Sequence, residues 1–325
     1  MAIVTLASKF SFSTNQDWDW MVAKLSSSFI SVENANYRQS FDGSFAITPD
    51  GIITGNATAS NFYVDDALVY SITGMSADAT QLQVFVENEG DTQQTYAFVL
   101  SGNDTINGSA DADVLAGFGG NDTMSGGAGN DLIIAGSGND TISGGAGNDT
   151  VTFSGARANY TVVKTAAGIT VTDKTGADGI DTVSGAERVL FTDSGIAFDG
   201  SGNGGEAYRV YQAAFNRTPD KGGVGFWINA MDKGMSLKEV AQNFVASAEF
   251  KVAYGAAPSN AELVGKFYEN VLHRQPEKGG FDFWVGVLDR NQASVADVLE
   301  GISESGENVA GLAAVIGAGF EYSLY

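Results

Sequence analysis

The stretch GGAGNDTVT, residues 144–152, joins a glycine-rich turn to a short β-branched tail, and close copies of it precede it in the chain. Six consecutive nine-residue words align on an aspartate at the sixth position: VLSGNDTIN, GSADADVLA, GFGGNDTMS, GGAGNDLII, AGSGNDTIS and GGAGNDTVT. The aspartates are Asp104, Asp113, Asp122, Asp131, Asp140 and Asp149. The eighth position always carries a large aliphatic residue: Ile106, Leu115, Met124, Ile133, Ile142 or Val151. The period predicts a solenoid in which each word forms a turn and a short strand with one inward side chain.

The residue types of the turn favour a hard cation. Glycines at the first, second and fourth positions allow positive φ and leave backbone carbonyls uncovered. Stacked turns would therefore surround one point with carboxylate and carbonyl oxygens, which are the ligands that Ca²⁺ prefers. A flexible Gly/Asn/Asp-rich linker is the alternative interpretation. A linker would not keep six aliphatic residues in strict register.

The pattern GGxGxDxUx, where U is a large aliphatic residue, resembles the RTX calcium-binding nonapeptide repeat. The resemblance implies a parallel β-roll, or calcium β-solenoid, in which two words make one coil. It also implies about four Ca²⁺ ions, each bound between a word and the word two further on. The earlier word would supply its aspartate and the carbonyls of positions two and four, and the later word its aspartate and the carbonyls of positions one and three.

Four ligand sets follow from this resemblance. They are Leu100, Gly102 and Asp104 with Gly117, Gly119 and Asp122; Ser109, Asp111 and Asp113 with Gly126, Ala128 and Asp131; Phe118, Gly120 and Asp122 with Ala135, Ser137 and Asp140; and Gly127, Gly129 and Asp131 with Gly144, Ala146 and Asp149. The second word departs from the pattern, because Asp111 and Ala112 replace glycine and asparagine. Nine-residue steps beyond Asp149 meet Ala158 and Ala167, so we expect the aspartate ladder to end with the sixth word.

Composition excludes several classes of protein. The 39 acidic and 17 basic residues give a net charge of -22, which disfavours nucleic acid and acidic membranes as partners. The absence of cysteine excludes disulfides and zinc–thiolate sites. The N-terminus lacks the pattern of a cleaved signal peptide, and the most apolar stretch, residues 310–320, is too short to span a bilayer. The RTX resemblance implies an extracellular or cell-surface bacterial protein, exported by a type I secretion apparatus through an uncleaved signal within Ser305–Tyr325.

The expected fold class is a multidomain β + α protein, with a β-rich N-terminal region, the β-roll and a C-terminal all-α domain. We expect domain ranges of 1–100, 101–152 for the roll, 153–200 for a β cap, and 201–325 for the helical domain. One helix is expected within residues 1–100, where the apolar residues Trp18, Met21, Val22, Leu25 and Phe29 have helical spacing. This stripe suits core packing better than membrane insertion.

The C-terminal third contains a second, longer repeat, because residues 211–234 match residues 268–291 at an offset of 57. Capping boxes at 236–239 and 259–262, and a weaker one at 294–297, mark helix starts. The motif RxPDxxGxxxW resembles a helical domain of unknown function found in secreted bacterial proteins, including S-layer proteins that bind surface polysaccharide. It makes Arg217, Trp227, Arg274 and Trp284 candidate glycan contacts. The alternatives are core packing for the tryptophans and turn-bracing salt bridges to Asp220 and Glu277 for the arginines.

No catalytic residues are expected. The single histidine, His273, aligns with Asn216 of the first helical copy, and we find no hydrolase, zincin or P-loop motif. Asp65 and Asp66 are adjacent and would point to opposite faces of a strand, so they make a poor glycosidase pair. We therefore expect a secreted, non-enzymatic, calcium-folded protein with a structural or adhesive role at the cell surface or in extracellular matrix, with possible self-assembly into homo-oligomers. The alternatives are a carbohydrate-active enzyme and a monomeric ligand-binding module.

Overall fold

The computed structural model describes residues 1–7, 21–33, 36–87 and 92–325 of the chain. These residues form two compact units, Met1–Thr192 and Asp193–Tyr325. Among the described residues, no helix has the length and apolar character needed to cross a bilayer.

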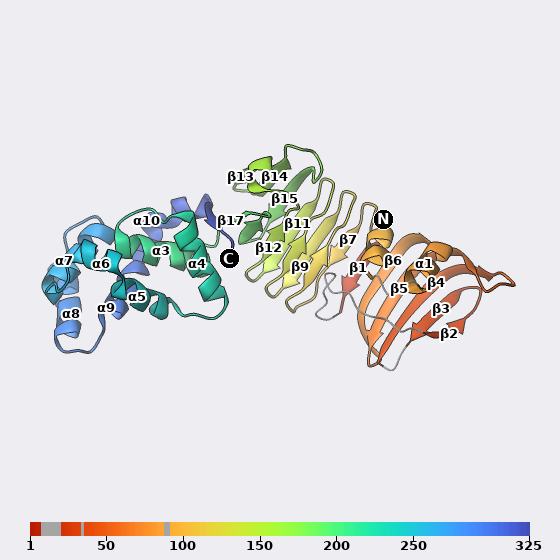
Figure 1. Cartoon of the computed structure of the whole chain (residues 1–325), viewed down its shortest axis with the longest axis horizontal. Helices are drawn as coiled ribbons and strands as arrows, with labels where there is room; N and C mark the ends of the chain where they lie inside the picture. Colours follow the sequence, from red (N-terminus) through yellow and green to blue (C-terminus); the bar gives the residue numbers. More distant parts are fainter. Residues whose placement is uncertain (8–20, 34–35, 88–91) are drawn as a thin grey trace. The chain divides into compact units, whose positions relative to one another are not determined.

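An antiparallel sheet forms the N-terminal part of the first unit (Figure 1). Its strands are β2 (Met21–Leu25), β3 (Phe29–Glu33), β4 (Tyr37–Ile47), β5 (Ile53–Val64), β6 (Ala67–Asp78) and β1 (Ile3–Leu6), in that spatial order. The helices α1 (Ala79–Glu87) and α2 (Thr92–Val99) pack on it and help to bury Phe62, Tyr70 and Tyr96. The sheet is continuous with the roll, because β1 also pairs in parallel with the first strand of the roll.

The helix expected from Trp18 to Phe29 is wrong over its described part. Met21–Leu25 and Phe29–Glu33 are strands that pair antiparallel with one another, and Trp18 lies outside the described residues. The serines at 26–28 make the connection, since the Phe29 amide donates to the Ser26 hydroxyl and the Ser26 amide donates to the Phe29 carbonyl. Pairing with neighbouring strands outweighs the helical spacing of a few apolar residues.

Asp65 and Asp66 also differ from the expectation, because they do not lie on a strand. They form the two-residue turn between β5 and β6, with φ values of 48° and 63°. Asx residues tolerate this left-handed conformation, which suits a tight hairpin turn.

The roll consists of two parallel sheets whose strands alternate along the chain, which confirms the predicted β-roll. One sheet contains β7 (Thr105–Asn107), β9 (Thr123–Ala128), β11 (Thr141–Ala146) and β15 (Ile180–Ser184), seen as successive rungs in Figure 1. The other contains β8 (Val114–Ala116), β10 (Leu132–Ile134), β12 (Thr150–Thr152) and β16 (Arg188–Leu190). Each word thus contributes one short strand, and successive words contribute to opposite sheets.

The core of the roll is a double row of aliphatic side chains. The six predicted eighth-position residues are each 1% exposed or less, which confirms the expected inward row. Val183 and Val189 continue the two rows and are 0% exposed. At the N-terminal end, Val4 on β1 pairs with Ile106 and is also 0% exposed, so the start of the chain covers that edge of the roll.

A hairpin interrupts the roll after the sixth word. A 3₁₀ turn (Arg157–Asn159) leads into β13 (Tyr160–Thr165) and β14 (Gly168–Asp173), which pair antiparallel, and β14 then pairs antiparallel with β15. The chain therefore leaves the roll, makes the hairpin, and returns at β15 to complete another coil.

The second unit contains two four-helix copies. The first consists of α3 (Asn203–Phe215), α4 (Lys221–Asp232), α5 (Leu237–Ala246) and α6 (Ala248–Tyr254), and the second of α7 (Asn260–Val271), α8 (Lys278–Asp289), α9 (Val295–Ser303) and α10 (Gly306–Gly317). The unit also contains an antiparallel pair, β17 (Ser194–Ala197) and β18 (Phe320–Ser323). Complete capping boxes begin α5, α7 and α9, so the three helix starts expected from the sequence are confirmed.

Candidate calcium sites

The repeated aspartates form two columns along the roll, one at each turn. In each column the backbone amide of one aspartate donates to Oδ1 of the aspartate 18 residues further on, at 2.8–2.9 Å. All six side chains are buried, with at most 3% exposure. The two-word coil predicted from the sequence therefore brings the carboxylates of alternate words together.

Asparagine and glycine fix the spacing between coils. The amides of Asn121 and Asn139 donate to Oδ1 of the asparagine two words earlier, at 2.8 and 2.7 Å. A Cβ on Gly138, where φ is +128°, would lie 1.9 Å from the Gly120 carbonyl oxygen. Glycine is needed at this position of the fifth word, because the preceding coil occupies the space of a side chain.

Five of the six repeated aspartates have one carboxylate oxygen that makes no hydrogen bond. Oδ2 of Asp104, Asp122, Asp131, Asp140 and Asp149 is buried without a hydrogen bond. Such an atom costs free energy unless a cation or a donor satisfies it. Asp113 is the exception, because its Oδ2 accepts hydrogen bonds from the amide and the hydroxyl of Ser109, at 2.7 and 2.8 Å. The second predicted ligand set is therefore the least suited to a cation.

Burial also changes the acidity of the columns. It raises the pKa of Asp122 to about 7, with a contribution from the carboxylates of Asp140 and Asp104, and that of Asp140 to about 6, with a contribution from Asp178. Burial likewise raises the pKa of Asp131 and of Asp149. Stacked carboxylates at this depth repel one another when ionised, so a bound cation would stabilise them at neutral pH.

The predicted ligand residues lie in the glycine-rich halves of the stacked words, some of them in the last residues of β9 and β11. The first-position glycines Gly117, Gly126 and Gly144 lie against Oδ2 of their own word's aspartate, and the fourth positions stack as Gly102–Gly120–Gly138 and Asp111–Gly129–Gly147. The remaining predicted residues of these words are Leu100, Ser109, Phe118, Gly119, Gly127, Ala128, Ala135, Ser137 and Ala146. Among the described residues no three Asp, Glu, His or Cys side chains converge. A cation here would therefore be held by two carboxylates and by backbone carbonyls, a set that fits Ca²⁺.

The expectation that the aspartate ladder ends with the sixth word is wrong. The Asp140 amide donates to Oδ1 of Asp181 at 2.8 Å, 41 residues further on, and the Ile180 amide donates to Oδ1 of Asn139 at 2.7 Å. The segment GADGIDTVS, residues 176–184, is thus a seventh word with aspartate at position six and valine at position eight. Stepping by nine missed it because the inserted hairpin lengthens the interval from 18 to 41 residues. In the other column Glu187 replaces aspartate, and its Oε2 accepts from the Asp149 amide at 2.9 Å.

The four candidate glycan contacts lie in the helical unit, and each of them contacts other residues of that unit. Arg217 bonds Glu249 at 2.9 Å and Asp220 at 3.3 Å, and Arg274 bonds Glu307 at 2.7 Å and Glu277 at 2.5 Å. The predicted turn-bracing salt bridges are therefore present. Each arginine also stacks on a tyrosine, Tyr211 or Tyr268.

The tryptophans of the two copies, Trp227 and Trp284, are half-buried. Trp227 packs edge-on against Phe244, with ring centroids 4.9 Å apart, and Trp284 lies against Gly301. The preceding residues are exposed, Phe226 by 47% and Phe283 by 57%. His273 occupies an exposed left-handed turn equivalent to that of Asn216 (φ 52° and 49°), which agrees with a turn residue.

Comparisons with known proteins agree with this architecture. The model of the RTX calcium-binding nonapeptide repeat (4 copies) matches residues 99–133 and 125–155, and that of the domain of unknown function DUF4214 matches residues 207–252 and 241–312. Among solved structures, the extracellular lipase LipA from Serratia marcescens is 23% identical with a TM-score of 0.28, over 30% of this chain and 17% of that one. No curated protein matches the chain. The chain thus contains RTX calcium-binding nonapeptide repeats in its roll and a match to the DUF4214 domain in its helical unit.

Proposed function

We propose that this protein is a secreted, non-enzymatic calcium-binding protein whose roll folds when it meets calcium outside the cell. The observation that carries the proposal is the double column of buried aspartates, in which all but Asp113 keep an unpaired Oδ2. The roll brings together the two words of each predicted ligand set, and about four ions would bind between them. The net charge of -22 adds to the benefit of binding cations.

The energetics suit a folding switch. A site with Kd of roughly 10⁻⁴ M is empty at cytosolic calcium and contributes about 1–3 kcal/mol at millimolar calcium. Several coupled sites then decide whether the short strands of the roll form, because each strand has only three to six residues. The unfolded chain would suit passage through a type I secretion apparatus, with the signal within Ser305–Tyr325.

The biological role that we propose is structural or adhesive, at the cell surface or in extracellular matrix. The helical unit would contact polysaccharide or another copy of the chain. The exposed rings of Phe226 and Phe283, at equivalent positions of the two copies, support a contact surface in this unit. Arg217 and Arg274, nine residues before these phenylalanines, are partly exposed, with 41% and 37% of their side chains accessible.

A carbohydrate-active enzyme remains the second candidate, and its catalytic region would have to lie in residues 1–100. Among the described side chains of that range no aspartate or glutamate is buried. The interior instead contains aromatic and aliphatic residues and a neutral polar network, in which Gln39 bonds Ser60 at 3.0 Å and Tyr70 at 3.2 Å. A packed interior of this kind favours a structural role for the N-terminal sheet.

The test is to follow circular dichroism and sedimentation of the full chain, first with chelator and then with calcium up to roughly 10 mM. We expect a cooperative gain of β signal and compaction, with large assemblies if the role is structural. Compaction to a monomer would support a soluble ligand-binding module instead, and a glycan array would then be the next measurement. A chain that responds to calcium in neither signal would overturn the proposal.

A further inference from the structure

The return of the chain at β15 creates an additional aspartate pair at the C-terminal end of the roll. Asp181 is 0% exposed and Asp140 is 2% exposed. Oδ2 of each is buried and makes no hydrogen bond. The Asp140 amide bonds Oδ1 of Asp181 at 2.8 Å, which is the same distance and the same atom pair as between Asp122 and Asp140.

The fifth and seventh words stack at their fourth positions and along their strands as the earlier words do, whereas a Cβ on Gly176, the first residue of the seventh word, would meet no atom within 4 Å. A Cβ on Gly179, where φ is +77°, would lie 2.2 Å from the Gly138 carbonyl oxygen, just as one on Gly138 would meet Gly120. Thr182 and Val183 pair in parallel with Thr141 and Ile142. The geometry on which the predicted sites depend therefore continues for one more coil, although the matched repeats end at residue 155.

We propose that Asp140 and Asp181 hold a further calcium ion, together with backbone carbonyls of Gly136, Gly138 and Asp178. The proposal rests on the proposed function, since it assumes that the roll binds calcium through stacked words. The donor set is again two carboxylates and carbonyl oxygens, which suits Ca²⁺.

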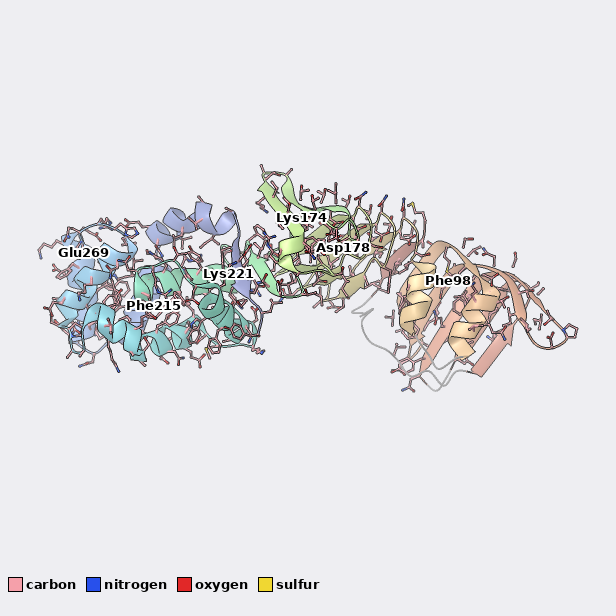
Figure 2. All side chains as sticks on the ribbon, turned by 45° about the horizontal axis from the view of Figure 1, so that its top comes forward. Phe98, Lys174, Asp178, Phe215, Lys221 and Glu269 are labelled. Atoms are coloured by element: carbon pink, nitrogen blue, oxygen red, sulfur yellow. The ribbon has the colours of Figure 1, made fainter. Side chains whose placement is uncertain are left out.

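This ion would link the roll to the inserted hairpin. The side chain of Asp178 accepts hydrogen bonds from the Tyr160 hydroxyl at 2.5 Å and the Ser154 hydroxyl at 2.7 Å. Tyr160 in turn packs against Phe153 and Phe191, with ring centroids 5.6 and 4.8 Å away. Figure 2 labels Asp178 at this end of the roll, with Lys174 of the hairpin nearby. Calcium at the Asp178 carbonyl would therefore order the aromatic cluster, which near-UV circular dichroism reports.

The experiment compares the full chain with Asp181→Asn by counting bound calcium ions in native mass spectrometry and by titrating near-UV circular dichroism. Asparagine keeps an Oδ1 that accepts from the Asp140 amide but loses the charge. We expect one ion fewer than in the unmodified chain, and a near-UV change that needs at least tenfold more calcium. The control Asp193→Asn removes the same charge at an exposed position and should match the unmodified chain. Should Asp181→Asn fail to fold, Asp181→Glu keeps the carboxylate and is expected to bind the last ion at least tenfold more weakly.

Two results distinguish a failure of the additional site from a failure of the proposed function. If Asp181→Asn or Asp181→Glu keeps the full number of ions and the unmodified near-UV midpoint, the additional site is wrong. Asp131→Asn, which belongs only to the ligand sets within the six words, should still lose calcium in that case, and the proposed function would stand. If the unmodified chain binds no calcium, the proposed function itself fails.

Discussion

The acidic residues of the roll and those of the helical unit differ in their hydrogen-bond and ion-pair partners. In the roll, buried aspartates stack on one another and all but one of the six repeated aspartates keep an unpaired oxygen. In the helical unit, acidic residues are bonded within the unit: Glu304 pairs with the buried Arg209 at 2.9 Å, and Glu239 and Glu262 complete capping boxes. This difference supports the proposal that the stability of the roll depends on an external cation, whereas the acidic residues named in the helical unit have partners within the unit.

The acidities of the two regions show the same contrast. Burial raises the pKa of Asp122 to about 7 and that of Asp181 to about 8. In the helical unit, a hydrogen bond from Tyr211 lowers the pKa of Asp220 to about 2, and the bond from Lys238 does the same for Asp297. Raised values mean that folding takes up protons, and lowered values mean that folding releases them.

The largest expected effect is therefore that, without calcium, the free energy of unfolding depends on pH differently in the two regions. The folded pKa values of Asp122, Asp140 and Asp181 lie above the unfolded value of about 3.9. The metal-free roll should therefore be most stable near pH 4 and lose stability progressively as the pH rises from about 4 to about 8. The helical unit should change less over this range, because its lowered carboxyls, Asp220 and Asp297, lose their contribution only below about pH 4, although burial raises the pKa of Glu206 and of Glu300. Hydrogen exchange in chelator at pH 5 and at pH 8, corrected for intrinsic exchange rates, measures the protection of both regions in one experiment. Equal protection of the roll at the two pH values would contradict this difference between the regions.

The next effect comes from the close approach of successive coils. A Cβ on Gly147, where φ is +149°, would lie 1.7 Å from the Gly129 carbonyl oxygen. Gly147→Ala should therefore cost about 1–3 kcal/mol for the backbone conformation and about 1–3 kcal/mol more for the displaced coil. The matched control is Gly255→Ala in the helical unit, where φ is +101° and no atom lies within 4 Å, so only the conformational cost applies. Denaturant unfolding in saturating calcium compares them, and equal losses would show that the coils can separate freely.

Asp122 provides a smaller, calcium-specific effect, because it belongs to two of the predicted ligand sets. Asp122→Asn keeps an acceptor for the Asp104 amide, which bonds Oδ1 of Asp122 at 2.8 Å, and removes one ligand charge. We expect the calcium midpoint of roll folding to rise about tenfold, which corresponds to about 1.4 kcal/mol. Asp113→Asn should shift the midpoint less, since Ser109 already satisfies Oδ2 of Asp113. Equal shifts in the two variants would remove the distinction between paired and unpaired carboxylates.

The sequence predicted the roll well because every word repeats the same local physics. Each eighth-position residue faces inward, and alternate aspartates meet, so the period alone determines both the core and the columns. The seventh word was not predicted because the inserted hairpin shifts it out of the nine-residue register, although the segment GADGIDTVS itself has the pattern. A search for single words at any spacing would have found Asp181.

The N-terminal region was less predictable because its order comes from distant contacts. Met21–Leu25 became a strand through pairing with β3, and β1 is ordered between β6 and β7, which lie far along the chain. No local pattern in MAIVTL indicates that its residue Val4 will pair with Ile106. The helical unit was intermediate in predictability. Its capping boxes are local signals in the sequence, whereas the bonds from Arg217 to Glu249 and from Arg274 to Glu307 join separate helices.

Those arginine bonds give the smallest expected effect and the clearest test of independence between the two regions. Arg274 forms a two-pronged pair with Glu307, Nε to Oε1 and Nη2 to Oε2, both at 2.7 Å. Lysine cannot reproduce this fork, but the pair is exposed, so Arg274→Lys should cost at most about 1 kcal/mol. Arg217→Lys, which removes a single-pronged bond to Glu249 at 2.9 Å, should cost less. Thermal unfolding followed by helical ellipticity measures both losses, which should be the same with chelator and with calcium. A change in the calcium midpoint of roll folding in either variant would show that the helical unit contributes to the charge balance of the roll, against the comparison drawn above.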